Sequence, residues 1–382
     1  MSICDWLPPD FGAVGQYAEI EARRLAAEGV EVTLVGLSSS ADETKDEKLG
    51  KGSLRTERLL VRPYERANLR QRAIWTARTN GRLLRRAWRH ARAADEILFT
   101  GSPPFFLHWI VPANLLLRKR LVYRITDFHP ECLIAELGRT PLALRFFLYW
   151  TLFLRRRVHQ FEVLGEDQKR RLIEIGIRPE RIVLRRDESP VSISPTTEPL
   201  ELPEELRGEV VLLYSGNFGV AHDDATFIEG YSQHHSRDAR DPGQTSKVVL
   251  WLNATGAKAD RVEAELRARG LPVHRSRPVA LAELGRLLVT PRAHLITLRN
   301  EFVGYVLPSK VYGCIASGRG VLFVGSAASD VDLLCSERMG GGREQAGAIY
   351  RRVDVGDAAG VARALDELAS GARGALAPDA LR

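Results

Sequence analysis

Two runs of alternating strand-like and helix-like segments, separated by a proline-rich break, constrain the fold of this chain most. In the first run, residues 16–28 have helical spacing and end at Gly29, and β-branched residues follow at 30–37. Further strand-like segments lie at 96–101 and 121–127. Strands that alternate with helices pair in parallel through crossover helices, so the pattern predicts an α/β layered fold.

The break covers residues 185–208, which contain four prolines, many Ser, Thr and Glu residues and no periodicity. This composition is typical of a linker. The alternation then resumes, and 382 residues exceed one ordinary core. We therefore expect two Rossmann-like, doubly wound domains that face a cleft. The expected organisation is a first domain at 1–187, a linker at 188–208, a second domain at 209–360, and a C-terminal helix at 361–382 that is a candidate to pack back on the first domain.

Composition excludes several classes of protein. Hydrophobic residues make up 45% and charged residues 27% of the chain, which is typical of globular proteins. No apolar run reaches the roughly 18 residues of a membrane span, and the N-terminus lacks the basic start and apolar stretch of a signal peptide. The four cysteines are scattered, so neither a disulfide framework nor a zinc site is indicated. These features predict a cytoplasmic protein.

The segment "NEFVGYVLPSKVYGCIASGRGVLFVG" at 300–325 combines an acid, a helix start and a lysine. Ser309 is a suitable N-cap for a helix that Gly318 closes. Free N–H groups at that helix start and the charge of Lys310 suit a phosphate, whereas Glu301 suits sugar hydroxyls. The combination indicates a sugar nucleotide, and the alternative is a capped helix with an ordinary surface lysine and glutamate.

Two glycine-containing loops are further candidates for ligand contact. Gly12 and Gly15 precede a helix and allow close approach of the backbone to a ligand; the alternative is a simple turn. The polar loop at 215–223, "SGNFGVAHD", lies between a strand and a helix. It is a candidate phosphate loop, and the alternative is a strand-end turn in which Asp223 or Asp224 caps the helix.

With these motifs in this order, the chain resembles a GT-B glycosyltransferase of family 4 (glycosyl transferases group 1), a retaining group, and in particular its bacterial surface-polysaccharide members. The resemblance rests on "PPDFGAVGQY", "LLYSGNFGVAHD", "EFVGYVLPSKVYGCIASGRGVLFVG" and the "GD" at 356–357. It implies a hexosyltransferase that moves a sugar from a nucleotide sugar to a hydroxyl acceptor with retention. The second domain would bind the nucleotide sugar and the first the acceptor, with no metal or other cofactor.

The resemblance also suggests roles for individual residues. Glu301 would contact sugar hydroxyls as a catalytic residue. Asp127 and His129, which lie between a strand and a helix, would orient or deprotonate the acceptor hydroxyl; the alternative is a helix cap with exposed polar residues. The expected donor-binding residues are Gly12, Gly15, Ser215, Gly216, Asn217, His222, Gly304, Ser309, Lys310 and Arg319.

The chain departs from the family pattern at three places. Ser309 stands where the family has a second glutamate, which binds the ribose. Asn217 and His222 stand where it has the arginine and lysine that hold the diphosphate, and Thr126 replaces a histidine. The positive charge for a diphosphate is therefore expected from Lys310 and Arg319.

The net charge of +7 is concentrated in one segment. Residues 51–92 contain thirteen Lys or Arg and two acids, a local charge of +11. The predicted helix at 70–92 suits an anionic membrane surface, and "FFLYWTLFLRRR" at 146–157 repeats the combination of aromatic residues and arginine. The alternative is an ordinary solvated face. Membrane docking would fit a lipid-linked acceptor at the inner face of the plasma membrane, and no nucleic-acid-binding signature accompanies the charge.

Two other functions are compatible with the same fold. A GT-B sugar-nucleotide epimerase would bind the same donor without an acceptor. A non-catalytic GT-B partner subunit would keep the fold and lack the second glutamate and the histidine, as this chain does.

Overall fold

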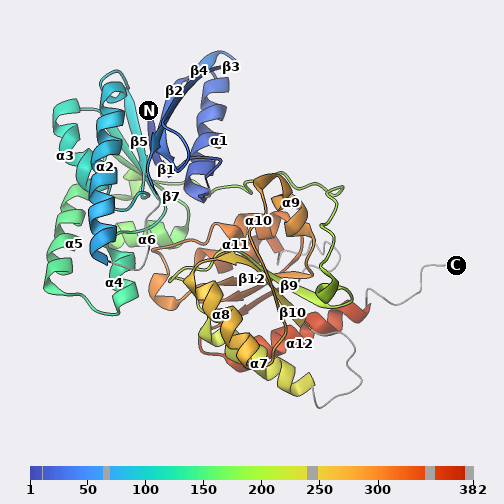
Figure 1. Ribbon diagram of the computed structural model, residues 1–382. Coiled ribbons are helices and arrows are strands. Elements are labelled where there is room, and N and C mark those ends of the chain that lie inside the picture. The colour runs from blue at the N-terminus through green and yellow to red at the C-terminus, as the bar shows by residue number, and fades with distance from the viewer. Residues whose placement is uncertain (11, 63–68, 239–247, 340–348, 375–382) are drawn as a thin grey trace. The chain divides into compact units, whose positions relative to one another are not determined.

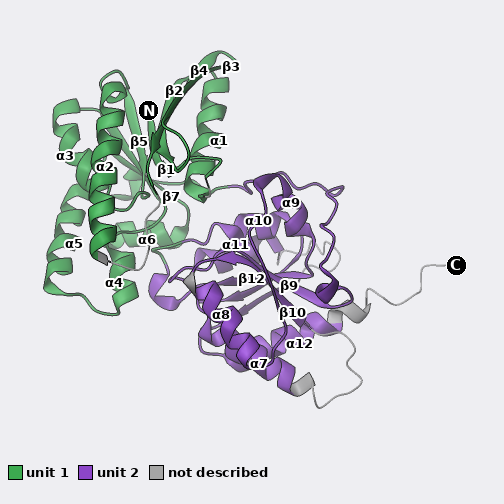
Figure 2. Ribbon diagram, in the orientation of Figure 1, with its two compact units in different colours: residues 1–187, 304–306 green, residues 188–303, 307–382 purple. Residues whose placement is uncertain are grey.

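The computed structural model describes residues 1–10, 12–62, 69–238, 248–339 and 349–374. The chain forms two compact units (Figures 1 and 2). Unit 1 comprises residues 1–187 together with 304–306, and unit 2 comprises residues 188–303 and 307–382. The boundary after Asp187 lies where the sequence places the end of the first domain.

Unit 1 is built on one sheet with the strand order β3-β4-β2-β1-β5-β6-β7-β8. Its strands pair in parallel except for the β3–β4 hairpin, which is antiparallel. The elements are β1 (Ser2–Trp6), α1 (Ala13–Ala27), β2 (Glu31–Ser38), β3 (Glu43–Leu49), β4 (Gly52–Leu60), α2 (Leu69–Ala91), β5 (Glu96–Thr100), α3 (Leu107–Leu117), β6 (Arg120–Ile125), α4 (Glu131–Leu137), α5 (Leu142–Arg155), β7 (Gln160–Val163), α6 (Glu166–Glu174) and β8 (Ile182–Leu184).

The strands of unit 1 bury both faces of the sheet. Successive strand side chains point to opposite faces, so Ile3 joins the core beneath α2, α3 and α5, whereas Cys4 joins a second core beneath α1. Leu83 of α2 and Ile110 of α3 fill the first core, and Ala22 lies in the second. Helices therefore cover both faces, as a parallel sheet requires.

Unit 2 is built on a fully parallel sheet with the strand order β11-β10-β9-β12-β13-β14. This is the strand order of dinucleotide-binding folds. The elements are β9 (Val210–Asn217), α7 (Ala225–Asp238), β10 (Val248–Thr255), α8 (Ala257–Ala268), β11 (Val273–Ser276), α9 (Leu281–Val289), β12 (Ala293–Thr297), α10 (Lys310–Ala316), β13 (Gly320–Val324), α11 (Asp330–Met339), β14 (Tyr350–Val353) and α12 (Ala358–Gly374).

Strand β9 shows how the sheet of unit 2 is covered on both faces. Leu212 and Tyr214 pack in one core with residues of α7, α8 and α12, whereas Leu213 packs in another with Leu287 of α9. The expectation of two parallel-sheet, doubly wound α/β domains is thereby confirmed.

The segment 188–208, which the sequence predicts to be a linker, belongs to unit 2. Leu206 is fully buried in the same core as Leu213 and Trp251, and Leu200 packs against that core. The second half of the segment thus lies on the sheet of unit 2, because its leucines supply apolar surface to that core. The proline-rich composition of the segment does not predict this packing.

The C-terminal helix also differs from the sequence-based expectation. Helix α12 packs within unit 2 rather than on the first domain: its Leu365 is fully buried with Phe227 of α7, and its Asp366 lies 2.6 Å from Nδ1 of His234. Residues 375–382 lie outside the described part of the chain. Among the helices that are described, none combines the length and apolarity needed to cross a membrane.

The strand order places one switch point in each unit. The order reverses between β1 and β5 in unit 1, and between β9 and β12 in unit 2. In open parallel sheets, ligands bind beyond the carboxyl ends of the strands at such a point. The residues that follow β1, β5, β9 and β12 are therefore the first candidates for a functional site.

The substitution Leu365→Ala tests the place of α12. Because Leu365 is fully buried in the core of unit 2, truncation should lower the free energy of unfolding of that unit by about 2–5 kcal/mol. Urea unfolding followed by tryptophan fluorescence measures the loss. The control Leu281→Ala removes a side chain that is 42% exposed and should cost less than about 1 kcal/mol; equal losses would contradict the packing.

Candidate functional site

The switch point of unit 2 is formed by the end of β9 and the loop that follows it. Ser215, Gly216 and Asn217 are the last residues of β9. Gly216 has φ +109°, a conformation that favours glycine. The amide of Phe218, the first residue after β9, donates to the carbonyl of Thr255 at the end of β10. The predicted polar loop therefore lies at the carboxyl edge of the sheet, with Asn217 exposed.

Lys310 places a buried ammonium group at this edge. Its Nζ lies 3.3 Å from the centroid of the buried Tyr214 ring, and within the described part of the chain Nζ has no hydrogen-bond partner. Burial lowers the pKa of Lys310 to about 7. A cation over an aromatic face is only partly compensated for its lost hydration, so this ammonium can accept an anionic ligand.

His222 lies beside Lys310 but cannot supply positive charge. Its Nδ1 is 2.6 Å from the carbonyl oxygen of Thr297 at the end of β12, and its ring stands edge-on to Tyr214 and Phe218. Burial, reinforced by the charge of Lys310, lowers the pKa of His222 to about 3. The neutral ring donates through Nδ1–H and holds the loop after β9 against β12, which bridges the switch point.

Lys258 is a second cation at this place, and the sequence analysis missed it. It lies in the first turn of α8 after Gly256, and its Nζ donates to the carbonyl of His222 (2.5 Å) and to Asp224 Oδ1 (2.9 Å). Its charge also contributes to the low pKa of His222. The signal in the sequence is a strand followed by glycine and then a lysine in the first helical turn, at 248–258.

Glu301 and Ser309 are two other residues of the 300–325 segment that the sequence predicts for the site. Glu301 follows β12 in a short 3-10 turn, with its side chain 56% exposed and 3.5 Å from Arg299. Ser309 occupies the N-cap position of α10 without a side-chain capping hydrogen bond. Helix α10 has seven residues, so its dipole is small, and Lys310 carries most of the charge here.

Two further predicted donor-binding residues lie in different settings. Arg319 follows the far end of α10 and precedes β13, so it lies at the amino edge of the sheet, where its charge acts on His294. This placement is a correction, because sequence proximity to Lys310 does not fix which edge of the sheet a residue occupies. Gly304 belongs to unit 1, its φ is +78°, and an added Cβ would lie 2.7 Å from the side chain of Arg171. Its donor-binding role stays a prediction.

The switch point of unit 1 brings together two carboxylates. Asp5 follows Cys4 in β1 and accepts a hydrogen bond of 2.7 Å from Ser102, which follows β5. Burial raises the pKa of Asp5 to about 6, and burial together with the charge of Asp5 raises that of Asp127 to about 6. Asp127 was predicted as a candidate, whereas Asp5 was missed because it precedes the glycine loop that attracted attention.

The glycine loop packs tightly beside Asp5. Gly12 is the N-cap of α1 with an extended backbone. A Cβ on Gly15 would lie 1.8 Å from the carbonyl oxygen of Trp6, so only glycine allows α1 to approach the end of β1 this closely. The helix start is thereby held next to the carboxylate of Asp5.

His129 differs from the two carboxyl groups because its ring is neutral. Burial lowers its pKa to about 4, so its ring is neutral, and the ring packs against Phe105. Its backbone carbonyl accepts a hydrogen bond from Arg155, which is fully buried and forms an ion pair with Glu131. Burial alone would lower the pKa of Arg155, but the Glu131 carboxylate raises it above its ordinary value.

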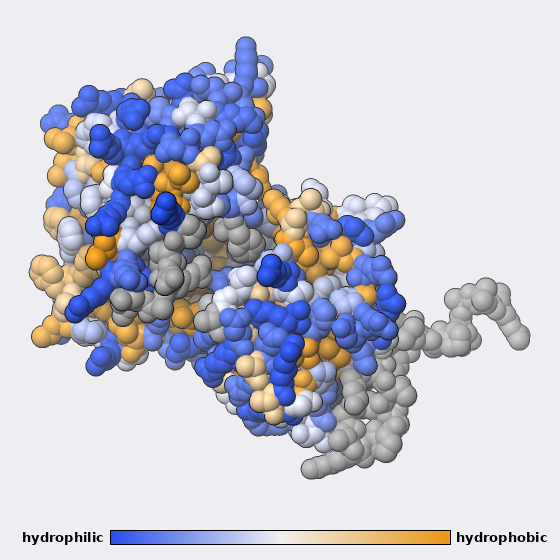
Figure 3. Space-filling view, in the orientation of Figure 1, coloured by the Kyte–Doolittle hydropathy of each residue, from blue (hydrophilic) through white to orange (hydrophobic). Residues whose placement is uncertain are grey.

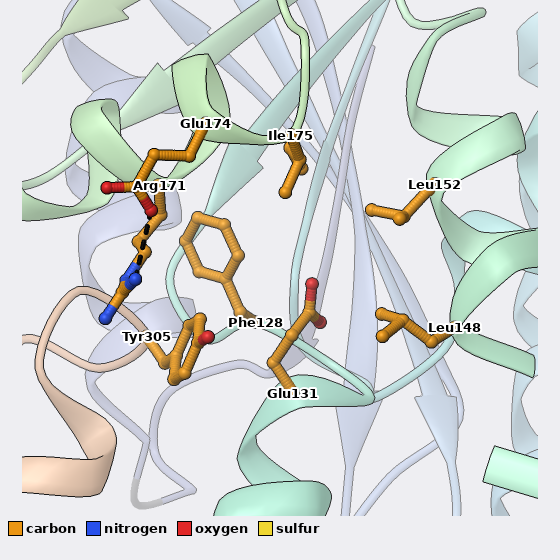
Figure 4. A pocket seen from close by; sticks show the side chains of 8 residues that line it. All are labelled: Phe128, Glu131, Leu148, Leu152, Arg171, Glu174, Ile175 and Tyr305. Carbon is orange, nitrogen blue, oxygen red and sulfur yellow. Dashed lines mark hydrogen bonds and ion pairs between the residues drawn. The ribbon is translucent and has the colours of Figure 1, made fainter. Parts of the chain in front are cut away.

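A pocket of about 130 Å³ lies in unit 1. One of its lining residues is Phe128, which lies between Asp127 and His129 in the sequence. In Figure 4, Leu148 and Leu152 of α5 face Phe128 and Tyr305 across it, and Arg171 pairs with Glu174 at its edge. Arg171 also lies over the Tyr305 ring, 5.0 Å from the centroid. The complete lining is Phe128, Glu131, Leu148, Leu152, Arg171, Glu174, Ile175 and Tyr305.

Solved structures resemble this architecture over nearly its whole length. The E. coli trehalose-6-phosphate structure bound with UDP-2-fluoro glucose has a TM-score of 0.62 at 11% identity, covering 96% of this chain and 91% of that one. The α,α-trehalose-phosphate synthase (UDP-forming) from Burkholderia xenovorans in complex with glucose-6-phosphate scores 0.59 at 13% identity, covering 98% and 95%.

The apo form of the lipopolysaccharide outer core galactosyltransferase WaaB scores 0.54 at 12% identity, covering 97% of this chain and 91% of that one. No known family model and no curated protein sequence matches the chain. At these identities the likeness establishes the fold alone: the chain has the two-domain GT-B fold.

The substitution Lys310→Met tests the state of the buried ammonium. The folded pKa of about 7 lies below the unfolded value of about 10.4. The unfolded chain therefore binds more protons between these values, and wild-type stability rises with pH across this window. Methionine removes the charge, so the variant should be more stable by roughly 2–4 kcal/mol near pH 6, and the gain should shrink toward pH 10.

Urea unfolding at a series of pH values measures this difference. The control Lys48→Met replaces an exposed lysine of β3 and should show no such trend. A stability difference for Lys310→Met that stays constant from about pH 6 to pH 10 would contradict the buried, uncompensated charge.

The substitution Asp127→Asn tests the carboxylate pair. The folded pKa of about 6 lies above the unfolded value of about 3.9, so the folded chain binds more protons between these values. Wild-type stability from this group therefore falls as pH rises through the window and is constant above it. The variant should gain roughly 1–3 kcal/mol relative to wild type above pH 6, and no gain near pH 4.

Thermal unfolding at several pH values checks this result, with the exposed Asp95→Asn as the matched control. A gain that is equally large near pH 4 and near pH 7 would show that the amide acts through packing and not through the removed charge.

Proposed function

We propose that the chain is a retaining glycosyltransferase that moves a hexose from a nucleotide sugar to a hydroxyl acceptor. The observation that carries the proposal is the pair of lysines at the switch point of unit 2. The described residues offer the buried ammonium of Lys310 no hydrogen-bond partner, and Lys258 lies against the same loop. This placement suits a diphosphate at the position where folds with this strand order bind nucleotides, and one structure of the same fold holds a UDP sugar.

In the proposed reaction, unit 2 holds the donor. The ammonium of Lys310 neutralises charge that develops on the departing diphosphate, and the last residues of β9, from Ser215 to Asn217, lie at the same edge of the sheet. Glu301 accepts hydrogen bonds from sugar hydroxyls, and the hydroxyl of Ser309 binds a ribose hydroxyl in place of the family's second glutamate. The lysines supply the positive charge, so the proposal includes no metal.

In the same proposal, unit 1 holds the acceptor. Asp5 lies in β1 and Asp127 follows β6, with β5 between the two strands, and the raised pKa of each carboxyl lets it hold or accept a proton near neutral pH at the acceptor hydroxyl. The acceptor oxygen bonds to the anomeric carbon as the bond from that carbon to the diphosphate oxygen breaks. The acceptor proton passes to the diphosphate, on the face that the leaving group vacates, which retains the configuration.

We further propose that the acceptor belongs to polysaccharide or glycolipid assembly, is lipid-linked, and is met by a cytoplasmic enzyme at the inner face of the plasma membrane. The support is the resemblance of the sequence to family 4 surface-polysaccharide enzymes, together with the basic segment 51–92, which contains thirteen Lys or Arg and two acids. On α2, Arg70, Arg78, Arg82, Arg85 and Arg89 are exposed along one face, as the sequence suggested.

Several side chains of α2 are engaged within unit 1. Arg86 is engaged by Asp42 (2.5 Å) and Glu57 (2.6 Å), and Arg82 donates to the carbonyl of Leu60. Trp75 and Trp88 pack against the core of unit 1 instead of facing outward. Helix α2 therefore offers charge without exposed aromatic rings, because its tryptophans are needed where the helix covers the sheet.

A binding and turnover assay with Lys310→Met tests the proposed function. Losing a charge-assisted contact to the diphosphate should weaken the binding of UDP- or GDP-sugars by about 1.5–3 kcal/mol, roughly 10- to 150-fold. Isothermal titration measures binding, and release of free nucleotide with a hydroxyl acceptor measures turnover. The control Lys48→Met should bind and turn over as wild type does.

The same assay separates the alternative functions. Nucleotide release that requires an acceptor supports transfer. A donor whose sugar is epimerised without acceptor would show an epimerase, and tight binding of donor without turnover would show a non-catalytic subunit. Unchanged binding in Lys310→Met would contradict the proposed diphosphate site.

A further inference from the structure

Helix α5 exposes a continuous apolar face. Its exposed hydrophobic side chains are spaced at i, i+4, i+7, i+8 and i+11, so they lie along one side of the helix. The opposite side is held in unit 1 through Thr151, Leu154 and Arg155, all buried. The exposed side chains, with their exposed fractions, are Leu142 (83%), Phe146 (75%), Tyr149 (60%), Trp150 (43%) and Phe153 (50%).

The neighbouring helix α3 extends this face. His108 of α3 stacks on Phe147 and lies edge-on to Trp150, and its Nε2 is 2.9 Å from Thr151 Oγ1. Figure 3 shows hydrophobic side chains along the margin of unit 1 that α3 and α5 form. The exposed side chains of α3 are Trp109 (37%), Leu115 (67%) and Leu116 (80%). We call these eight side chains of α3 and α5 the α3–α5 face.

The two sequence segments that form the α3–α5 face carry basic residues and no acids, although Arg120 pairs with Glu96 outside them. No acidic residue occurs in the sequence between Glu96 and Asp127, or between Glu136 and Glu162, and these two segments contain α3 and α5. Arg157 lies over the Phe153 ring, 4.0 Å from its centroid. The exposed basic residues of the two segments are Arg118, Arg120, Arg139, Arg145, Arg156 and Arg157.

We infer that the α3–α5 face docks on an anionic lipid bilayer. Tyr and Trp have an apolar body and a polar tip, and so prefer the boundary between headgroups and acyl chains. Arginines that border such rings reach the anionic headgroups. A protein partner of ordinary composition would bring acidic and basic groups in mixture, whereas the basic residues that predominate along these two segments match a uniformly negative surface.

The inference moves the docking surface from α2 to α5. Helix α2 exposes arginines without aromatic rings, whereas α5 exposes both in one face. Charge alone gives roughly fivefold tighter binding per basic residue near an anionic surface, and it is screened by salt. Burial of apolar side chains in the bilayer adds a contribution to the binding free energy that salt does not remove. This docking is independent of the chemistry proposed above, since it can be measured without turnover.

Flotation of the full-length protein with vesicles tests the docking surface. The vesicles contain phosphatidylcholine alone or phosphatidylcholine with phosphatidylglycerol. Wild type should float with the anionic vesicles and stay at the bottom with the neutral ones. The double variant Leu142→Glu with Phe146→Glu should lower partitioning at least tenfold. Both side chains are more than 70% exposed, so the fold and thermal midpoint should be retained.

The matched control adds the same two charges elsewhere. Ile20→Glu with Leu281→Glu replaces side chains that are 50% and 42% exposed and should float as wild type does. A neutral variant, Phe146→Ser, should reduce partitioning less than the double variant and more than the control, because it removes apolar contact without adding charge.

Four outcomes would overturn the inference. Wild type could fail to float, or could float equally with neutral vesicles. The reversal Arg78→Glu with Arg85→Glu and Arg89→Glu could abolish flotation while the α5 double variant still floats, which would place docking on α2. Light scattering could show a wild-type dimer that the α5 double variant dissolves, without vesicle binding in either, which would make the face an interface between two copies of the chain.

Discussion

The ammonium of Lys310 over the Tyr214 ring is the interaction on which the account of this protein depends. A buried charge without a hydrogen-bond partner lowers stability unless a ligand compensates it. The ring recovers only part of the lost hydration, and His222 beside it is neutral. Among the described residues the position is therefore incomplete, and the diphosphate of the proposed donor would complete it. A buried group with a strongly shifted pKa, which lowers stability and favours binding of a ligand, is characteristic of functional sites.

The parallel sheets explain why the polar groups gather where they do. Each strand delivers its last residue to the same edge, and the reversal of strand order leaves room for a ligand there. In unit 2 this edge collects Lys310, Lys258 and His222, and in unit 1 it collects Asp5, Ser102 and Asp127. The acceptor and donor roles proposed for the two units follow from this difference in charge.

Much of the fold could be predicted from the sequence, because helical and strand periodicity is local. The helix expected at 16–28 is α1 (Ala13–Ala27), and the strand expected at 30–37 is β2 (Glu31–Ser38), shifted by one residue. The residues of the site are less predictable, since sites combine the ends of strands that are distant in sequence. Lys258 and Asp5 were missed for this reason, and Arg319 was misplaced because nine residues separate it from Lys310 across a helix.

Helices α2 and α5 show a second limit of sequence-based prediction. Arginines and tryptophans on α2 suggest an amphipathic surface helix, but periodicity does not say which side a sheet will cover. The tryptophans pack inward there. The apolar sequence of α5 is equally compatible with a buried helix, yet Leu142 and Phe146 are largely exposed. Only tertiary packing distinguishes an apolar face that is covered from one that needs a partner.

The most direct test of the central claim is the titration of the Lys310 side chain by NMR of a ¹³C-labelled Cε, with and without UDP. The account predicts a pKa of about 7 in the free protein and a marked rise when UDP is bound, because the diphosphate stabilises the charged form. A pKa near the ordinary lysine value in the free protein, or one that UDP leaves unchanged, would contradict it.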